Sequence, residues 1–431
     1  MSKLDELIQE LCPNGVENKT LAELFNTRNG YTPSKSKPEF WENGTVPWFR
    51  MEDIRVNGRI LSEAAQYVSR SAVKGDLFPE NSIIVATSAT IGEHALITVP
   101  SLANQRFTYL MLKAQYKDMF DTKFLYYYCF KLDNYCKECL NQGNFASVDM
   151  KKFAKFEFPM APLDVQREIV RILDNFTELT AELTAELTAR KKQYEYYRDT
   201  LLQAPEEIKP VKLSSVCEVY DGTHQTPNYT SSGVPFASVE NIDNLYGTTK
   251  FISAEDFAKY KIKPRVGDVF MTRITAGIIG RCAVVDRNDD LAYYVSLALL
   301  RPNPSILDSK YLKYYLESGW GRKELAKHIL WDATPTKINK DDIGKVLIAV
   351  PPLSVQQRLV GVLDNFDTIC SDLNIGLPAE IEARQKQYEF YRDALLTYAA
   401  TGKTILTDRQ TDRQTDRQTD RQTDRQTDRR V

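Results

Sequence analysis

The feature of this sequence that most constrains its fold is an internal repeat of two helical blocks. The stretch APLDVQREIVRILDNF (161–176) returns as PPLSVQQRLVGVLDNF (351–366), and RKKQYEYYRDTLL (190–202) returns as RQKQYEFYRDALL (384–396). The identity within these blocks is too dense to arise by chance. The chain is therefore expected to hold two similar halves, each a variable segment followed by a helical block.

The first helical block predicts one long amphipathic helix. Its apolar residues recur mostly every three or four positions from Val165 to Leu201, which is the pattern of a helix that packs along its whole length. A helix over residues 164–202 would be about 58 Å long at ~1.5 Å per residue. Inside it, ELTAELTAELTA (178–189) repeats a four-residue unit. Because this unit is close to one helical turn, a change in copy number would lengthen the helix and keep its pattern.

The second helical block differs from the first in its middle. Seventeen residues (367–383) separate its two conserved segments, against thirteen (177–189) in the first block. The additional residues include Gly376 and Pro378, and a glycine followed by a proline ends one helix and starts another. The second helix is therefore expected to be broken, and the two blocks are expected to pack antiparallel. A generic coiled-coil dimer is the alternative.

The variable segments also repeat, more weakly. VPWFRMEDI (46–54) resembles VPFASVENI (234–242), and ATSATIG (86–92) resembles TRITAGIIG (272–280). Buried strands are expected within 81–91 and 267–276, and helices within 124–140 and 311–325. Each variable half is long enough to bury its own core. The predicted fold class is α/β in the mixed α+β sense: two globular domains separated by two long antiparallel helices, with a pseudo-twofold internal repeat.

Composition excludes several classes of protein. No run of about 18 apolar residues occurs, so no membrane span is expected. The seven cysteines have no framework spacing, which favours a reducing cytoplasm. The net charge of −2 argues against a wholly basic nucleic-acid binder, so any DNA contact must come from local patches or a partner. Phosphate-binding, dinucleotide-binding and zinc-protease motifs are missing, and the chain lacks the usual equipment for catalysis.

The chain ends on five copies of Thr-Asp-Arg-Gln between residues 407 and 426. This tail has no apolar residue to bury, and we expect it to be disordered. The codons ACA, GAC, AGA and CAG would encode the repeat as ACAG in tandem. Our hypothesis is that such a DNA repeat slips and switches the reading frame, which would be phase variation.

The doubled order APL-x-VQ…LDNF followed by QYE[YF]YRD-x-LL resembles the specificity subunit of type I restriction–modification enzymes, over about residues 1–400. The resemblance implies that each variable half is a target recognition domain that reads one part of a split double-stranded DNA site. It implies that the repeated helices dock two methyltransferase (modification) subunits, and two restriction subunits where the system has them. Catalysis, S-adenosylmethionine, ATP and Mg²⁺ would belong to those partners, and this chain would hold no cofactor or metal of its own. In related systems specificity varies by DNA slippage, which gives the tail repeat a rationale.

The resemblance divides the chain into five parts. They are an N-terminal segment with the first target recognition domain (1–160), the first spacer helix (161–203), the second target recognition domain (204–350), the second spacer helices (351–400) and the tail (401–431).

Base readout requires side chains with paired donors and acceptors, and phosphate contacts require Lys, Arg, Ser or Thr. The polar loops that recur at matched places in the two halves supply the candidate DNA-binding residues. In the first half they are Lys35, Lys37, Arg50, Arg55, Thr87, Ser88, Thr90, Asn104, Gln105, Arg106, Asn141, Gln142 and Asn144. In the second half they are His224, Gln225, Asn228, Arg273, Thr275, Arg281, Thr334, Thr336 and Lys337.

The helical blocks supply the candidate partner-docking residues, although packing within the chain is the alternative role for each of them. These candidates are Asp174, Asn175, Phe176, Tyr197, Asp364, Asn365, Phe366 and Tyr391.

Other signals are weaker. Cys136 and Cys139 resemble half a zinc site, but no second pair follows, so buried or free thiols are expected. His94 has no evident partner and is expected in a loop. Two rival functions remain open. A coiled-coil interaction scaffold has no role in reading DNA, so any binding would show no sequence preference. An enzyme would turn over substrate as the purified chain.

Overall fold

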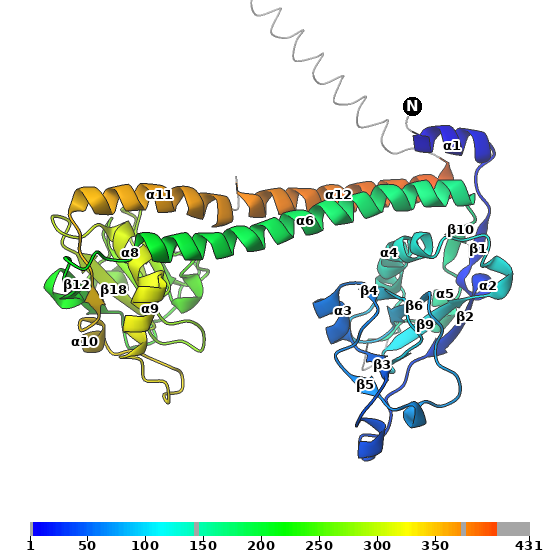
Figure 1. Cartoon of the computed structure of the whole chain (residues 1–431), viewed down its shortest axis with the longest axis horizontal. Coiled ribbons are helices and arrows are strands. Elements are labelled where there is room, and N and C mark those ends of the chain that lie inside the picture. Colours follow the sequence, from blue (N-terminus) through cyan, green and yellow to red (C-terminus); the bar gives the residue numbers. More distant parts are fainter. Residues whose placement is uncertain (1–2, 142–145, 372–375, 403–431) are drawn as a thin grey trace, which may run out of the picture. The chain divides into compact units, whose positions relative to one another are not determined.

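The computed structural model of the chain describes residues 3–141, 146–371 and 376–402 (Figure 1). The predicted tail lies outside the described residues from position 403 onward. The chain divides into two compact units: Met1–Ala181 with Ala383–Val431, and Glu182–Glu382. Each unit therefore combines one variable segment with parts of both helical blocks. No helix in the described part of the chain is both long and apolar enough to cross a membrane.

The first unit is built on a five-stranded sheet of order β2-β9-β6-β7-β4, in which only the pair β4–β7 is parallel. A three-stranded sheet of order β5-β3-β8 and a pair β1-β10 complete it. The strands are β1 (Asn18–Thr20), β2 (Phe25–Asn29), β3 (Val46–Phe49), β4 (Ile60–Leu61), β5 (Tyr67–Val68), β6 (Ser82–Ala86), β7 (His94–Ile97), β8 (Leu102–Ala103), β9 (Phe107–Leu112) and β10 (Glu157–Pro159). The helices are α1 (Lys3–Leu11), α2 (Leu21–Leu24), α3 (Met51–Asn57), α4 (Thr122–Glu138) and α5 (Met150–Phe153).

The second unit repeats this plan. Its four-stranded sheet of order β12-β18-β15-β16 corresponds to β2-β9-β6-β7 of the first unit. Its three-stranded sheet β14-β13-β17 corresponds to β5-β3-β8, and its pair β11-β19 corresponds to β1-β10. Its strands are β11 (Val211–Lys212), β12 (Cys217–Asp221), β13 (Val234–Ala237), β14 (Phe251–Ile252), β15 (Val269–Thr272), β16 (Cys282–Val284), β17 (Ala292–Tyr293), β18 (Leu297–Pro302) and β19 (Leu347–Ile348). Its short helices are α7 (Ala254–Ala258), α8 (Ser309–Glu317), α9 (Gly319–Ala326) and α10 (Lys340–Ile343).

Strand alternation explains the two layers in each unit. Along β6, Ile83 and Val85 pack in the cluster that contains α4, whereas Ile84 and Ala86 pack in the cluster of the smaller sheet. Because successive side chains of a strand point to opposite faces, a fully apolar strand serves two cores at once. The buried strands predicted within 81–91 and 267–276 are confirmed as β6 and β15, and the predicted mixed fold is confirmed.

The long helix is confirmed to within one residue at each end. It is α6 (Leu163–Leu201), seen as the long green helix in Figure 1, and it has residues in both units. The predicted break in the second block is also confirmed, because that block forms α11 (Leu353–Ser371) and α12 (Leu377–Thr401).

The two blocks run antiparallel within each unit. In the first unit, residues 165–173 near the start of α6 share a core with residues 395–399 near the end of α12, and Phe176 stacks on Tyr391. In the second unit, Tyr197 of α6 stacks on Phe366 of α11, while Leu202 shares a core with residues 360–363. In both units the residue numbers rise along one helix as they fall along the other, so the helices are antiparallel, as predicted.

One predicted element is wrong in detail. The helix expected over 311–325 is two helices, α8 and α9, because Ser318 leaves the helical conformation with φ −71° and ψ 164°. The Ser318 hydroxyl accepts a hydrogen bond from the Gly321 N–H at 3.2 Å and so caps α9. A side chain at Gly321 would come within 2.1 Å of the Tyr315 carbonyl oxygen, so the glycine permits this close turn.

Candidate nucleic-acid interface

In the first unit, three segments that are far apart in the sequence meet where β6 ends and β9 begins. The Thr87 N–H donates to the Arg106 carbonyl at 2.9 Å, and the Val148 N–H donates to the Thr87 carbonyl at 3.0 Å. Ser88 pairs with Ser147 in an isolated antiparallel bridge. The predicted segments 87–88 and 104–106 therefore lie together with Asn141 and Ser147 at one end of the sheet.

The second unit builds the same junction with other residues. The Arg273 N–H donates to the Ser296 carbonyl at 2.9 Å, and the Ile338 N–H donates to the Arg273 carbonyl at 2.9 Å. Ile274 forms an isolated bridge with Lys337. The structure thus brings together the predicted residues Arg273, Thr275, Thr336 and Lys337, and Thr334 lies exposed in the same segment.

Side chains at the junction of the first unit present amides and a cation. Asn104 accepts a hydrogen bond from the Arg106 N–H at 2.9 Å through its side-chain oxygen, and Gln105 accepts from the Thr32 hydroxyl. Gln105 and Arg106 are exposed. Asn141 is also exposed, and its amide donates to the Val148 carbonyl at 3.3 Å. The predicted Gln142 and Asn144 lie outside the described residues.

The charged side chains of the second junction are more constrained. Arg273 is only 5% exposed and forms an ion pair with Asp221. Its Nε has no hydrogen-bond partner among the described residues, and burial lowers the pKa of its guanidinium. His224 is exposed, with Nε2 3.8 Å from Asp221 Oδ2. Arg281 forms an ion pair with Asp243.

The other predicted residues of the first unit have different local settings. Lys35 and Lys37 are exposed, and the Lys37 ammonium lies 5.0 Å from the Phe40 ring centre. Arg50 precedes α3 and pairs with Glu52 at 3.0 Å. Arg55 is exposed on α3 itself, so its predicted place in a loop is wrong. Thr90 lies in the turn after β6, and its hydroxyl is buried with no partner among the described residues.

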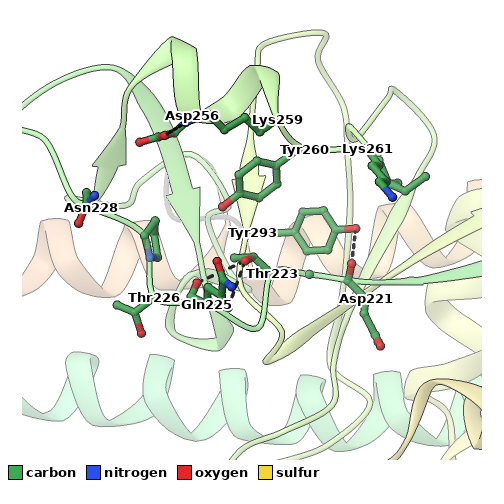
Figure 2. A pocket seen from close by; sticks show the side chains of 13 residues that line it. Asp221, Thr223, Gln225, Thr226, Asn228, Asp256, Lys259, Tyr260, Lys261 and Tyr293 are labelled. Carbon is green, nitrogen blue, oxygen red and sulfur yellow. Dashed lines mark hydrogen bonds and ion pairs between the residues drawn. The ribbon is translucent and has the colours of Figure 1, made fainter.

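A hollow of about 600 Å³ opens beside the second junction (Figure 2). Predicted residues Gln225 and Asn228 line it, together with Asp221 and Thr223. Its other lining residues were missed by sequence reasoning: Asp256, Lys259, Tyr260, Lys261 and Tyr293. The alternation of lysines with apolar and aromatic residues in KYKIK (259–263) is a sequence signal for Lys259, Tyr260 and Lys261.

The candidate docking residues of the LDNF segments anchor the helices to their own domains. Asp174 accepts a hydrogen bond from the Tyr127 hydroxyl at 2.7 Å and lies 2.7 Å from the Lys123 ammonium. In the second unit, Asp364 accepts from the Tyr314 hydroxyl at 2.6 Å and lies 2.7 Å from the Lys310 ammonium. Burial acts to raise the pKa of Asp364, but these two hydrogen bonds hold it below its usual value.

The glutamine of each VQ motif also makes equivalent hydrogen bonds in the two units. Gln166 is fully buried, and its side chain bonds the Asp121 N–H at 2.8 Å and the Ala161 carbonyl at 2.6 Å. Gln356 repeats these contacts with the Asp308 N–H at 2.8 Å and the Pro351 carbonyl at 2.7 Å. The repeated motif is therefore explained by packing within each unit.

The aromatic candidates are partly covered by helix–helix contacts. Phe176 and Tyr391 stack with ring centres 5.5 Å apart, and Phe366 and Tyr197 stack at 5.7 Å. Tyr197 remains 40% exposed. The neighbouring candidates Asn175 and Asn365 are exposed. Asn175, Asn365 and Tyr197 thus remain available to a partner, and docking by all of these candidates stays a prediction.

His94 is not in a loop, contrary to the sequence expectation. It is fully buried in β7, and its Nδ1 lies 2.7 Å from Asp133 Oδ1 of α4. Burial lowers the pKa of His94, with Asp133 opposing the shift. Cys136 and Cys139 are buried, as predicted, and burial raises the pKa of the Cys136 thiol to about 12. Within residues 3–141, 146–371 and 376–402, no group of three or more His, Cys, Asp or Glu side chains could hold a metal ion.

The chain is similar in sequence to known proteins, among them the following two. Over 239 residues the chain is 56% identical to the type I restriction enzyme EcoprrI specificity subunit of Escherichia coli, covering 52% of this chain and 60% of that protein. Over 297 residues it is 33% identical to a putative type I restriction enzyme specificity subunit of Haemophilus influenzae, covering 66% of this chain and 74% of the relative. The chain thus matches less than two thirds of the length of the Escherichia coli protein.

A solved chain shares the fold. It belongs to a structure described as the basis of complex assembly and conformational transition of the type I R-M system, and it covers 90% of this chain with a TM-score of 0.61 at 20% identity. The family model described as the type I restriction modification DNA specificity domain matches residues 13–190 and 205–383. These matches take in both units and most of the chain. The chain therefore belongs to the type I restriction modification DNA specificity domain family and carries that domain twice.

Proposed function

We propose that the chain is a non-catalytic DNA-reading subunit, and that each unit reads one half of a split double-stranded site. Methyltransferase subunits would dock on α6, α11 and α12, two copies in all, and two restriction subunits would join them where the system has them. S-adenosylmethionine, ATP and Mg²⁺ would be held by these partners. The complex would act in the cytoplasm.

A duplicated framework that carries different side chains is the observation behind this proposal. The same backbone hydrogen bonds place Thr87 in one unit and Arg273 in the other, and they place Ser147 in one unit and Lys337 in the other. A scaffold without DNA contacts does not require different side chains at matched positions of the same backbone. Two readers of different base sequences must differ there, because base edges are distinguished by the donors and acceptors of the side chains.

The duplicated helices support the docking of two copies of one partner. The anchors Asp174 and Asp364 sit at equivalent places, as do the stacked pairs that contain Tyr391 and Tyr197. A chain that presents similar surfaces twice suits a pair of identical subunits. Because the chain is not strongly basic, much of the phosphate contact is assigned to those subunits.

Methylome sequencing tests this proposal. A methylation-free host would express the chain with the methyltransferase encoded beside it, and a second culture would express the methyltransferase alone. The expected result is a new split N6-adenine motif that depends on the chain. A soluble, associated pair of proteins that yields no motif would contradict the proposal, provided that a chain cut after Thr401 also yields none.

Variants assign each half of the motif to a unit. Gln105→Ala in the first unit is expected to relax one half-site and to leave the other unchanged, and Lys337→Ala in the second unit is expected to affect only the other half-site. If both variants altered the same half-site, the assignment of one half-site to each unit would be wrong.

A further inference from the structure

The two units have a glycine at equivalent positions, and in the second unit this glycine lines the hollow. In the first unit, a side chain at Gly30 would come within 2.3 Å of the Ala103 carbonyl oxygen, and the next residue, Tyr31, donates its N–H to that oxygen at 2.8 Å. The glycine therefore lets this segment lie directly against β8.

The second unit repeats this contact. A side chain at Gly222 would come within 2.8 Å of the Tyr293 carbonyl oxygen on β17, and the Thr223 N–H donates to the same oxygen at 3.2 Å. Since β17 corresponds to β8, Thr223 is the structural equivalent of Tyr31 in the first unit.

The two side chains at this position have opposite effects. The Tyr31 hydroxyl reaches the segment across from it, where it lies 3.5 Å from the Ala72 carbonyl and accepts from the Lys74 N–H. The Lys74 ammonium lies 5.6 Å from the Tyr31 ring centre. The first unit therefore bridges this space with an aromatic ring, whereas the shorter Thr223 borders the hollow of about 600 Å³.

The walls of the hollow have the chemistry that recognises a nucleobase. Tyr260 extends from the end of α7 toward the loop that carries Thr223 and Gln225 (Figure 2). An aromatic side chain stacks on any base, and the amides of Gln225 and Asn228 offer a donor and an acceptor to a base edge. Lys261 is exposed at the rim, in reach of a phosphate next to the base.

The loop that presents these amides is fixed locally. The Thr223 hydroxyl accepts from the Gln225 N–H at 3.2 Å and donates to the Gln225 carbonyl at 3.3 Å. The hollow also adjoins the candidate DNA junction, because Asp221 lines the hollow and pairs with Arg273. A duplex read at the junction would place its bases beside this opening.

We propose that the second unit takes one unstacked nucleobase of its DNA half-site into this hollow, while the first unit fills the same space with Tyr31 and takes in no base. This inference rests on the proposed function. A base that leaves the stack exposes the edge that pairing hides, so Gln225 and Asn228 read it directly. The free energy needed to unstack one base is similar in size to the free energy gained when a base stacks on one aromatic side chain.

Fluorescence of 2-aminopurine tests the proposal on the complete complex. This adenine analogue brightens when it leaves the base stack. It would replace each adenine of both half-sites in turn, on either strand, once the methylome has given them. The methyltransferase subunits turn out the adenine that they methylate, so a rise at that adenine is expected irrespective of the hollow. The proposal predicts one additional rise in the half-site read by the second unit, and none in the other half-site.

Two variants test the walls by different means. Thr223→Tyr fills the hollow with the side chain that the first unit carries at this position. Tyr260→Leu keeps apolar bulk and removes the stacking ring, and it is expected to weaken binding about tenfold, the order that loss of one aromatic stack gives. Both variants should abolish the additional fluorescence rise. Ala258→Ser, at an exposed position of α7 that does not line the hollow, is the control.

The outcomes separate this inference from the proposed function. A wild-type complex that yields no split motif overturns the proposed function. A split motif with no fluorescence rise beyond the methylated adenines, or with an additional rise that survives both variants, overturns the inference alone.

Discussion

Two ionisable side chains with shifted pKa values, His94 and Glu317, have hydrogen-bond partners in distant parts of the sequence. His94 is neutralised by burial beside Asp133, which lies 39 positions away. Glu317 accepts the Cys282 N–H at 2.8 Å, 35 positions away, and burial raises the pKa of its carboxyl. Neither partner could be chosen from the sequence, because nothing local marks it, and so His94 was wrongly expected in a loop.

The variant Glu317→Gln is expected to stabilise the protein at neutral pH. The folded pKa of Glu317 is raised, so its protonated form favours folding, and this contribution is lost as the pH rises through the folded pKa. A glutamine still accepts the Cys282 N–H and does not ionise. Thermal unfolding from pH 8 to pH 4 should show a higher melting temperature for the variant at neutral pH. The advantage should disappear near pH 4, about the unfolded pKa of glutamate.

The control for this experiment is Glu255→Gln, at an exposed glutamate of the same unit. It is expected to leave the pH profile of the melting temperature unchanged. An equal shift in both variants, or a Glu317→Gln variant that is less stable at neutral pH, would show that burial of this carboxylate has no net cost.

At the scale of elements, the helices were predictable and their attachments were not. The period of the apolar residues predicted α6 to within one residue, and Gly376 with Pro378 predicted the start of α12. The role of Asp174 required the structure, because its partner Tyr127 lies 47 positions earlier on α4. Ser318 differs, because its partners Tyr315 and Gly321 are each three positions away, and this local cap was missed in predicting a single helix.

The two anchors give a prediction about how each helix is held. Asp174→Ala and Asp364→Ala each leave a tyrosine hydroxyl without its acceptor, and each is expected to cost about 1–3 kcal/mol of the free energy of unfolding. The lysine of each pair is about half exposed and adds little. Hydrogen exchange should rise in α4 for the first variant and in α8 for the second.

The neighbouring exposed residue supplies a matched control, Asn175→Ala, which should leave exchange in α4 unchanged. The two costs are expected to add in the double variant, because the anchors share no partners. Exchange that rises in both units after a single substitution would mean that the anchors are coupled, against this account.

At the scale of the whole molecule, the duplication gives two units that both include residues of α6. The four-residue repeat (178–189) extends across the division between the units at position 181. We therefore expect its copy number to determine the spacing between the two half-sites.

Deletion of residues 182–185 removes one repeat unit, about 6 Å of helix at ~1.5 Å per residue. At ~3.4 Å per base pair, the unspecified spacer of the methylation motif is expected to shorten by about two base pairs, with both half-sites unchanged. Methylome sequencing reads the spacer directly. Replacement of the same four residues by alanines keeps the helix length and should keep the spacer. An identical spacer in the deletion variant would contradict the role of the helix as a ruler.

The sequence by itself determined the duplication, the long helices, the mixed fold and the family, because these depend on periodicity and on repeated motifs along the chain. It also indicated which loops gather at the candidate interface, since segments 87–88 and 273–275 occupy matched places. Only the tertiary structure decided that Arg273 is buried against Asp221, and that Thr223 leaves open a space that Tyr31 fills. The physical reason is that burial, pairing and cavity shape are set by residues brought together from positions about 40 to 50 apart in the sequence, as Tyr31 with Ala72 and Asp221 with Arg273 are.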